Sequence, residues 1–173
     1  MNINKPYIIA EMACSHEGDI SLAKKIVDSA GIAQANAIQF QIWTAEEIMV
    51  KHSPDFEKLK NIELEREEWS NLYTYTRVNW PKLSIIACVY DEESIKFCET
   101  LGVDAYKIHA SDISNPKILS LVASTNKRID LSIGASSISE IDSAIKIIRF
   151  NSNSPIWLMY GYQLFPTPAN SLN

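Results

Sequence analysis

The sequence predicts an α/β protein built as an incomplete TIM (β/α)8-type barrel of about six βα units. Short apolar, β-rich runs alternate with amphipathic helical segments from end to end, which is typical of parallel strands joined by helical crossovers. An open doubly wound sheet would give the same alternation, but no G-x-G-x-x-G follows the first apolar run. Polar residues inside or at the ends of several strands favour a barrel whose mouth holds a site.

The first half of the chain contains three predicted strands. Their apolar, β-rich runs cover Tyr7–Met12, Ala37–Trp43 and Leu83–Val89. The segment 20–33 places its apolar residues on one helical face, and a second helix is predicted from about 66 to 78. The polar stretch 44–62, with Pro54 inside it, is expected to form an excursion above the barrel mouth.

In the second half, local end signals define the helices. Gly102 ends a helix over 92–101, Asn115 followed by Pro116 begins the next, and Ser137 with Glu140 forms a capping-box pattern that opens a helix to about residue 148. The remaining strands are predicted at Asp104–His109, Arg128–Ile133 and Pro155–Tyr160.

Composition indicates one ordinary globular domain over residues 1–173. The net charge of −5, without a basic stripe, argues against a nucleic-acid partner. No apolar stretch approaches the length of a membrane span and no signal-peptide pattern begins the chain, so we expect no membrane partner and a cytoplasmic location. Cys14, Cys88 and Cys98 lack metal-ligand spacing, and we expect them to be reduced.

Three polar residues on the first two strands are candidates for a site. Glu11 lies in an apolar run, where an unpaired carboxylate is costly to bury; the alternatives to a functional role are a salt bridge or a helix cap. Gln39 and Gln41 are two residues apart and therefore share a face, which we expect to point into the barrel lumen. Their amides suit hydrogen bonds to a polyhydroxylated substrate, or they satisfy each other in the core.

The fourth and fifth strands supply the remaining candidates. Lys107, His109 and Ser111 alternate and are expected on one face, with Asp112 at the strand end. A buried lysine needs a counter-charge, which a bound phosphate or carboxylate could supply; an ion pair between Lys107 and Glu11 is the alternative. Ser132 adds a hydroxyl two residues before Gly134. Such a mouth suits an anionic substrate and proton transfer.

Five segments together resemble one family of enzymes. IIAEMACSHEGD, AIQFQ, AYKIHASD, LSIGAS and LMYGYQLFPTP occur in that order, from residue 8 to residue 168. This series is similar to that of the sialic acid (N-acetylneuraminate) synthases and their legionaminate and pseudaminate relatives. The resemblance implies condensation of phosphoenolpyruvate with an N-acylated aminosugar to a sialic-type acid, for surface polysaccharide biosynthesis. It also implies a divalent metal, manganese or magnesium, that polarises the sugar aldehyde.

The resemblance assigns roles by position. Lys107 and Ser132 match contacts to phosphoenolpyruvate, and Gln41 matches an amide that contacts the sugar. Asp112 matches an acidic residue for proton transfer or water activation, and Glu11 matches an acidic residue near the metal and the sugar. We therefore expect Asp112 and Glu11 to be catalytic.

Several positions depart from the family pattern. Gln39 stands where the family has a lysine, Cys88 replaces a threonine and Ala110 replaces a serine; all three family residues contact ligand. Gln163 and Phe165 replace an asparagine and a tyrosine beside the sugar. His109 stands where the family has glycine, and our hypothesis is that a protonated His109 partly replaces the cation missing at position 39.

The resemblance also implies parts that these 173 residues do not include. The family's two metal-ligating histidines and its antifreeze-like domain would lie beyond Asn173, and the full-length protein is expected to be a homodimer. No metal ligand is assigned within this chain. Two rival interpretations stay open: a catalytically impaired homologue that binds a sugar or a partner, and a different barrel aldolase that uses Lys107 as a Schiff-base nucleophile.

Overall fold

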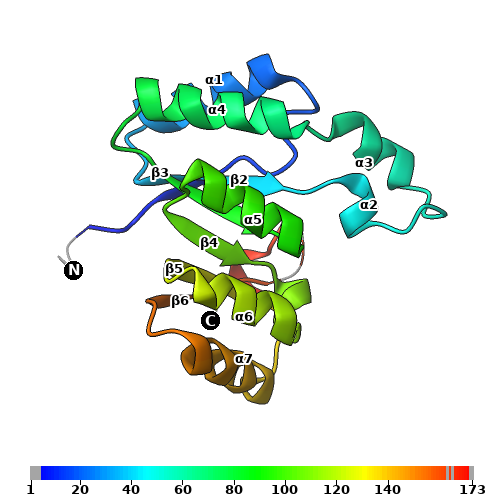
Figure 1. The fold of residues 1–173 in the computed structure, drawn as a ribbon, viewed down its shortest axis with the longest axis vertical. Coiled ribbons are helices and arrows are strands. Elements are labelled where there is room, and N and C mark those ends of the chain that lie inside the picture. The colour runs from blue at the N-terminus through cyan, green and yellow to red at the C-terminus, as the bar shows by residue number, and fades with distance from the viewer. Residues whose placement is uncertain (1–4, 163, 165, 172–173) are drawn as a thin grey trace.

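The computed structural model describes residues 5–162, 164 and 166–171 and contains a parallel sheet of six strands (Figure 1). The strands are β1 (Ile9–Glu11), β2 (Ala37–Ile42), β3 (Ser84–Val89), β4 (Ala105–Ile108), β5 (Arg128–Ser132) and β6 (Ile156–Met159). They lie in chain order, and each strand pairs in parallel with the next. A doubly wound sheet would reverse its order at a switch point. The sequential order therefore confirms the prediction of an incomplete barrel.

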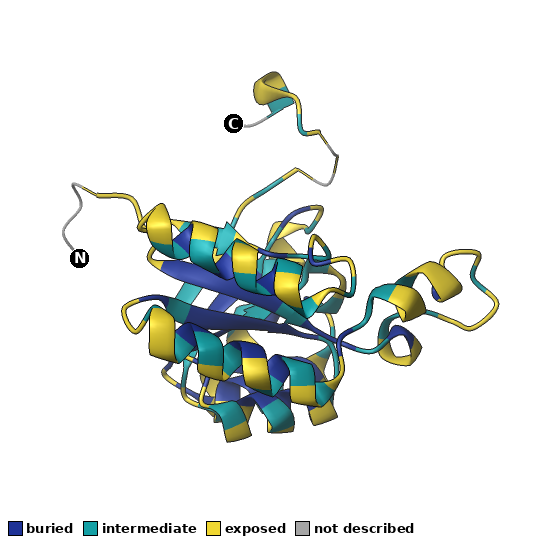
Figure 2. Cartoon of the chain, turned by 90° about the horizontal axis from the view of Figure 1, so that it is seen from above, coloured by how far each residue is buried: buried dark blue, intermediate teal, exposed yellow. Residues whose placement is uncertain are grey.

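Helices cover the outer face of this sheet and form the crossovers between strands (Figure 1). The α-helices are α1 (Ile20–Ile32), α2 (Ala45–Ile48), α3 (Phe56–Ile62), α4 (Arg66–Asn79), α5 (Glu92–Leu101), α6 (Pro116–Ser124) and α7 (Ile138–Asn151). Two 3-10 helices are η1 (Ala110–Asp112) and η2 (Ala169–Ser171). Exposed residues lie on the sides of the helices that face away from the buried strands (Figure 2).

The predicted helix ends are confirmed where a side chain or a glycine specifies them. Gly102 adopts φ = +79° at the end of α5, a conformation that favours glycine. The Asn115 side chain accepts a hydrogen bond from a backbone N–H of α6, and Pro116 occupies the first turn. Ser137 and Glu140 form the predicted capping box at the start of α7.

The two faces of the sheet have different compositions. Ile38, Phe40 and Ile42 of β2 point outward and join the main apolar core beneath the helices. The inner face carries a small apolar layer near the strand starts that includes Ala37, Ile86 and Ala105. Gln39 and Gln41 alternate with the outward residues of β2 and therefore face the lumen, as predicted.

The sheet is curled strongly enough that its two outer strands approach each other. Tyr7, just before β1, packs edge-on against Trp157 of β6, with ring centroids 5.0 Å apart. The Arg128 guanidinium lies 4.0 Å from the centroid of the Trp157 ring and 5.1 Å from that of the Tyr7 ring. Because β1 and β6 are at opposite ends of the strand order, this contact crosses the lumen.

The excursion between β2 and α4 differs in detail from the prediction. It contains two short helices, α2 and α3, which the sequence did not indicate, and it projects from the body beyond the ends of the strands (Figures 1 and 2). Thr44 and Glu47 form a capping box at the start of α2. All three cysteines are free.

Candidate functional site

The candidate residues on the first four strands gather on the inner face, near the carboxyl ends of the strands. The register pairs Glu11 with Gln39, Gln41 with Cys88, and Cys88 with Lys107. In each pair the two side chains point to the same side of the sheet. Carboxylate, amide, thiol and ammonium therefore line one wall of the mouth, the end at which barrel enzymes hold their active sites.

Glu11 interacts with several other groups of this wall. Its carboxylate accepts hydrogen bonds from the Gln39 amide and from the backbone N–H of Ala13, the latter at 3.1 Å. Desolvation raises the pKa of Glu11, opposed first by the positive charge of Lys107 and then by hydrogen bonds from Ala13, Gln41 and Gln39. Its side chain keeps 41% exposure because β1 is an outer strand. Glu11 is thus neither capping a helix nor sealed in the core.

Lys107 lies near Glu11 on the same wall of the mouth. Its Nζ is 3.9 Å from Glu11 Oε2, close enough for attraction but too long for a hydrogen bond, and its side chain is 17% exposed. The alternative considered above, an ion pair with Glu11, is therefore present in a loose form. The ammonium keeps hydrogen-bonding capacity for a ligand.

Cys88 is buried beside Lys107. Burial raises the pKa of its thiol to about 11, so the thiol is protonated near neutral pH. Its Sγ lies 3.6 Å from the hydroxyl of Tyr90, to which it donates. Cys88 is therefore a weak donor in the wall and not a thiolate nucleophile.

The end of β4 differs from the predicted alternation. The strand stops at Ile108, because the His109 side chain caps η1 by accepting a hydrogen bond from the backbone N–H of Ser111. Ser111 consequently belongs to a turn and is exposed, and it does not continue the lumen-facing row of Lys107 and His109. The expectation that these three side chains share one strand face is wrong at Ser111.

The environment of His109 also disfavours its charged form. Burial lowers the pKa of His109, the positive charge of Lys107 lowers it further, and Asp112 opposes these effects. The hypothesis of a protonated His109 that replaces a missing cation is therefore not supported, because the neutral imidazole is the favoured form.

Asp112 lies in η1 beside this cap. Its Oδ1 accepts a hydrogen bond from the Asn115 amide at 3.1 Å, and its Oδ2 accepts one from the Ser111 hydroxyl at 3.2 Å. The carboxylate is held on both oxygens at the rim of the mouth. Ser132 is the last residue of β5 and is partly buried. Gln163 and Phe165 lie outside the described residues.

Sequence reasoning missed a second charged pair in the lumen. Asp130 is fully buried and accepts two hydrogen bonds from Arg128, at 2.9 and 3.0 Å. Burial raises the pKa of Asp130, opposed by Arg128 and by Lys107, its neighbour in the register. The alternation of Arg128, Asp130 and Ser132 within a strand was the available signal, since residues two apart share a face.

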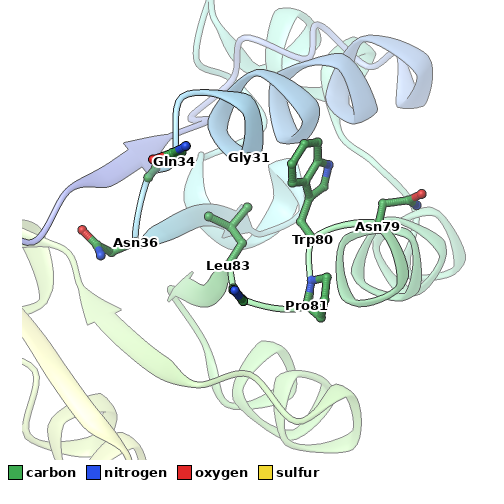
Figure 3. A pocket seen from close by; sticks show the side chains of 9 residues that line it. Gly31, Gln34, Asn36, Asn79, Trp80, Pro81 and Leu83 are labelled. Atoms are coloured by element: carbon green, nitrogen blue, oxygen red, sulfur yellow. The ribbon is translucent and has the colours of Figure 1, made fainter.

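A cavity of about 670 Å³ lies at the other end of the sheet (Figure 3). It is lined by residues that precede β2 and β3, among them Asn36, Trp80, Pro81 and Leu83. The Trp80 indole packs over Gly31, where a Cβ would come within 2.1 Å of the ring. The cavity contains none of the predicted site residues and is distinct from the mouth.

The described residues contain neither a metal-binding cluster nor a membrane-spanning helix. They contain no group of three His, Cys, Asp or Glu side chains placed to hold a metal ion. The divalent metal implied by the resemblance therefore does not fit the side chains of this part of the chain. Among the same residues, no helix combines the length and apolarity needed to cross a bilayer.

Comparison with known proteins agrees with this geometry. The chain is 34% identical over 169 residues to an uncharacterised protein of Methanocaldococcus jannaschii, covering 96% of this chain and 49% of that protein. It is 26% identical to the N,N'-diacetyllegionaminic acid synthase of Campylobacter jejuni, covering 99% of this chain and 55% of the enzyme. The chain thus spans about half the length of the curated relatives it matches.

A solved structure shows the same fold. The N-acetylneuraminic acid synthetase of Leptospira borgpetersenii, crystallised with citrate, superimposes with a TM-score of 0.91 at 29% identity, over 98% of this chain and 59% of that one. A truncated 3-deoxy-D-arabino-heptulosonate 7-phosphate synthase of Thermotoga maritima, at 17% identity and a TM-score of 0.69, supports the fold alone. The NeuB family matches residues 26–173. With that match over most of its length, the chain belongs to the NeuB family.

Proposed function

We propose that the protein contributes the donor-binding part of an enzyme that condenses phosphoenolpyruvate with an N-acylated aminosugar to give a nonulosonic acid. Homologues in the family are synthases of legionaminic, pseudaminic and sialic acids. The observation that carries the proposal is the loosely paired ammonium of Lys107 at the mouth, 3.9 Å from Glu11.

Lys107 is the proposed anchor for the anionic donor. Its ammonium is largely buried, and a buried cation without a hydrogen-bonded counter-ion is costly unless a ligand supplies one. The Ser132 hydroxyl, at the end of the neighbouring strand, would donate to the same anion. The Gln41 amide, on the same wall and separated from Lys107 by β3, would contact the sugar.

Two carboxylates are proposed to handle protons. In the condensation, C3 of phosphoenolpyruvate attacks the sugar aldehyde, water adds at C2 and phosphate leaves. Asp112, fixed by Asn115 and Ser111, is the proposed base for the water. Glu11, whose pKa is raised by burial, is the proposed acid for the new alkoxide. No step is assigned to a metal, since the described residues hold no set of ligands for one.

Calorimetric titration with phosphoenolpyruvate tests the proposal. Binding to the wild-type chain should weaken about 10- to 100-fold in Lys107→Met, because a charge-assisted contact is lost. Lys82→Met is the matched control, since Lys82 is exposed and lies at the opposite end of the sheet, and it should bind as the wild type does. Absence of binding in the wild type, or equal binding in Lys107→Met, would contradict the proposal.

The condensation itself is tested by phosphate release with a panel of N-acylated aminosugars and added Mn²⁺ or Mg²⁺. Release that requires both the donor and a sugar would support the reaction. Incubation with borohydride and a keto substrate, with no covalent adduct at Lys107, would separate it from a Schiff-base aldolase.

A further inference from the structure

We propose that His109 binds the anionic donor substrate as a neutral hydrogen-bond donor, through Nε2–H, and that the turn after β4 fixes the required tautomer. The inference rests on the proposed function for the identity of the ligand, but the tautomer of His109 is a property of the ligand-free protein. It replaces the idea of a charged His109 with a different chemistry at the same position.

The tautomer follows from one hydrogen bond. The backbone N–H of Ser111 points at Nδ1 of His109 at 3.3 Å, and a backbone N–H can only donate. Nδ1 must therefore present its lone pair, and in a neutral imidazole the proton is then on Nε2. The Ser111 hydroxyl lies 2.9 Å from the same nitrogen and 3.2 Å from Oδ2 of Asp112, so its single hydrogen can turn to either acceptor; turned to Nδ1, it would favour the same tautomer.

Protonation would break this arrangement. An imidazolium carries hydrogen on both nitrogens, so Nδ1–H would face the Ser111 N–H, donor against donor. Burial and the nearby ammonium of Lys107 act in the same direction and lower the pKa of His109, while Asp112 acts against them. The Tyr90 ring, 5.7 Å away from centroid to centroid and tilted by 42°, covers one side of the imidazole.

Nε2–H is left without an acceptor in the described part of the chain, since both contacts of the imidazole involve Nδ1. A partly buried donor of this kind, just past the end of β4 and two residues after a loosely paired ammonium, is suited to an oxyanion. A neutral donor also avoids repulsion of Lys107. The two groups therefore make one anion-binding site, in which Lys107 supplies the charge and His109 the directional bond.

The first test is the tautomer in the ligand-free protein. Long-range ¹H–¹⁵N correlation spectra of ¹⁵N-histidine-labelled protein, assigned with single histidine variants, should show His109 as neutral at about pH 7, with the proton on Nε2. Ser111→Gly keeps the backbone N–H and should leave the tautomer unchanged. An imidazolium, or a proton on Nδ1, would overturn the inference.

The second test is the affinity for phosphoenolpyruvate. His109→Ala should bind about tenfold more weakly, whereas His109→Gln, whose amide can place a donor near the Nε2 position, should recover most of the loss. His52→Ala, an exposed histidine in the α2–α3 excursion, is the control and should bind as the wild type does.

The dependence of affinity on pH separates the two chemistries. From about pH 7 to about pH 8.5, the wild type and His109→Gln should change in parallel, because neither side chain titrates there. A steeper loss in the wild type would mean a cationic His109 and would overturn the inference. Equal affinity in His109→Ala would overturn it while leaving the proposed function intact. Absence of binding in the wild type and in every variant would overturn both.

Discussion

The lumen contains two pairs of a cation and a carboxylate, and they differ in how completely each satisfies itself. Arg128, at the start of β5, makes two hydrogen bonds to the fully buried Asp130 and lies against two aromatic rings. At the mouth, Lys107 stands 3.9 Å from a half-exposed Glu11 and makes no hydrogen bond to it. Arg128 and Asp130 satisfy each other's hydrogen-bonding capacity and form a saturated pair. Lys107 and Glu11 do not, so the Lys107 ammonium can still donate hydrogen bonds to a ligand.

The residue types fit this difference. A guanidinium presents a planar fork that matches a carboxylate on two oxygens and stacks on aromatic rings, so it is suited to a permanent pair. An ammonium is a compact point charge on a flexible stem, which can turn from one partner to another. We therefore infer that Arg128 and Asp130 serve stability and that Lys107 and Glu11 serve binding.

The largest predicted effect comes from breaking the saturated pair. Arg128→Met should lower the free energy of unfolding by about 3–5 kcal/mol, because it leaves a buried carboxylate without its partner. Denaturant unfolding measures this. The double variant Arg128→Met/Asp130→Leu should recover most of the loss, and a small effect of Arg128→Met alone would contradict the assignment.

A second variant would give Glu11 a closer cationic partner than Lys107. Gln39→Lys places an ammonium beside Glu11, which should neutralise that carboxylate and release Lys107 for an anion. Affinity for phosphoenolpyruvate should rise about tenfold, or about 1.4 kcal/mol. Titration of Gln39→Met, which has no charge at this position, supplies the control; tighter binding there as well would refute the electrostatic explanation.

Removal of the open cation should affect stability much less than removal of Arg128. Lys107→Met should change the free energy of unfolding by less than about 1 kcal/mol, because Glu11 keeps its amide donors and its contact with water, and Asp130 keeps its two hydrogen bonds from Arg128. The same denaturant experiment decides it. A loss as large as that of Arg128→Met would show that the two pairs are equivalent and would remove the basis of the comparison.

The smallest predicted effect is a dependence of stability on pH that originates at Glu11. Its folded-state pKa is raised above the usual 4.5, so the folded protein holds this proton more tightly than the unfolded chain does. The contribution of Glu11 to stability should therefore fall as the pH rises from about 4.5 through the raised pKa. Unfolding of Glu11→Gln across this range should show a flatter slope; an unchanged slope would exclude Glu11 as its source.

Local signals made much of the fold predictable. Gly102, Asn115 and Ser137 mark helix ends through interactions within a few residues, and the structure has each of them. The lumen-facing glutamines followed from strand alternation in the same way. The short helices α2 and α3, of four and seven residues, were missed because such lengths carry little periodic pattern.

The details of the site depended on contacts that no local pattern encodes. The bond between Gln39 and Glu11 exists because β1 and β2 pair in one particular register. The end of β4 is set by an imidazole that accepts a backbone hydrogen bond, a role for which Ser, Thr, Asp and Asn are the usual residues. Strand alternation alone therefore predicted that the lumen-facing row of polar residues continues to Ser111, beyond the actual end of β4.

The packing of Tyr7 against Trp157 has a mechanical consequence for the mouth. This contact joins the two outermost members of the strand order at their starts, and the strands between them are hydrogen-bonded to one another throughout. The curvature of the sheet is thereby set at the starts of the strands. Relatively stiff strands transmit it to their carboxyl ends, where the mouth lies. A smaller side chain at position 157 would alter the separation of Glu11 and Lys107 by changing the shape of the sheet, although it touches neither residue.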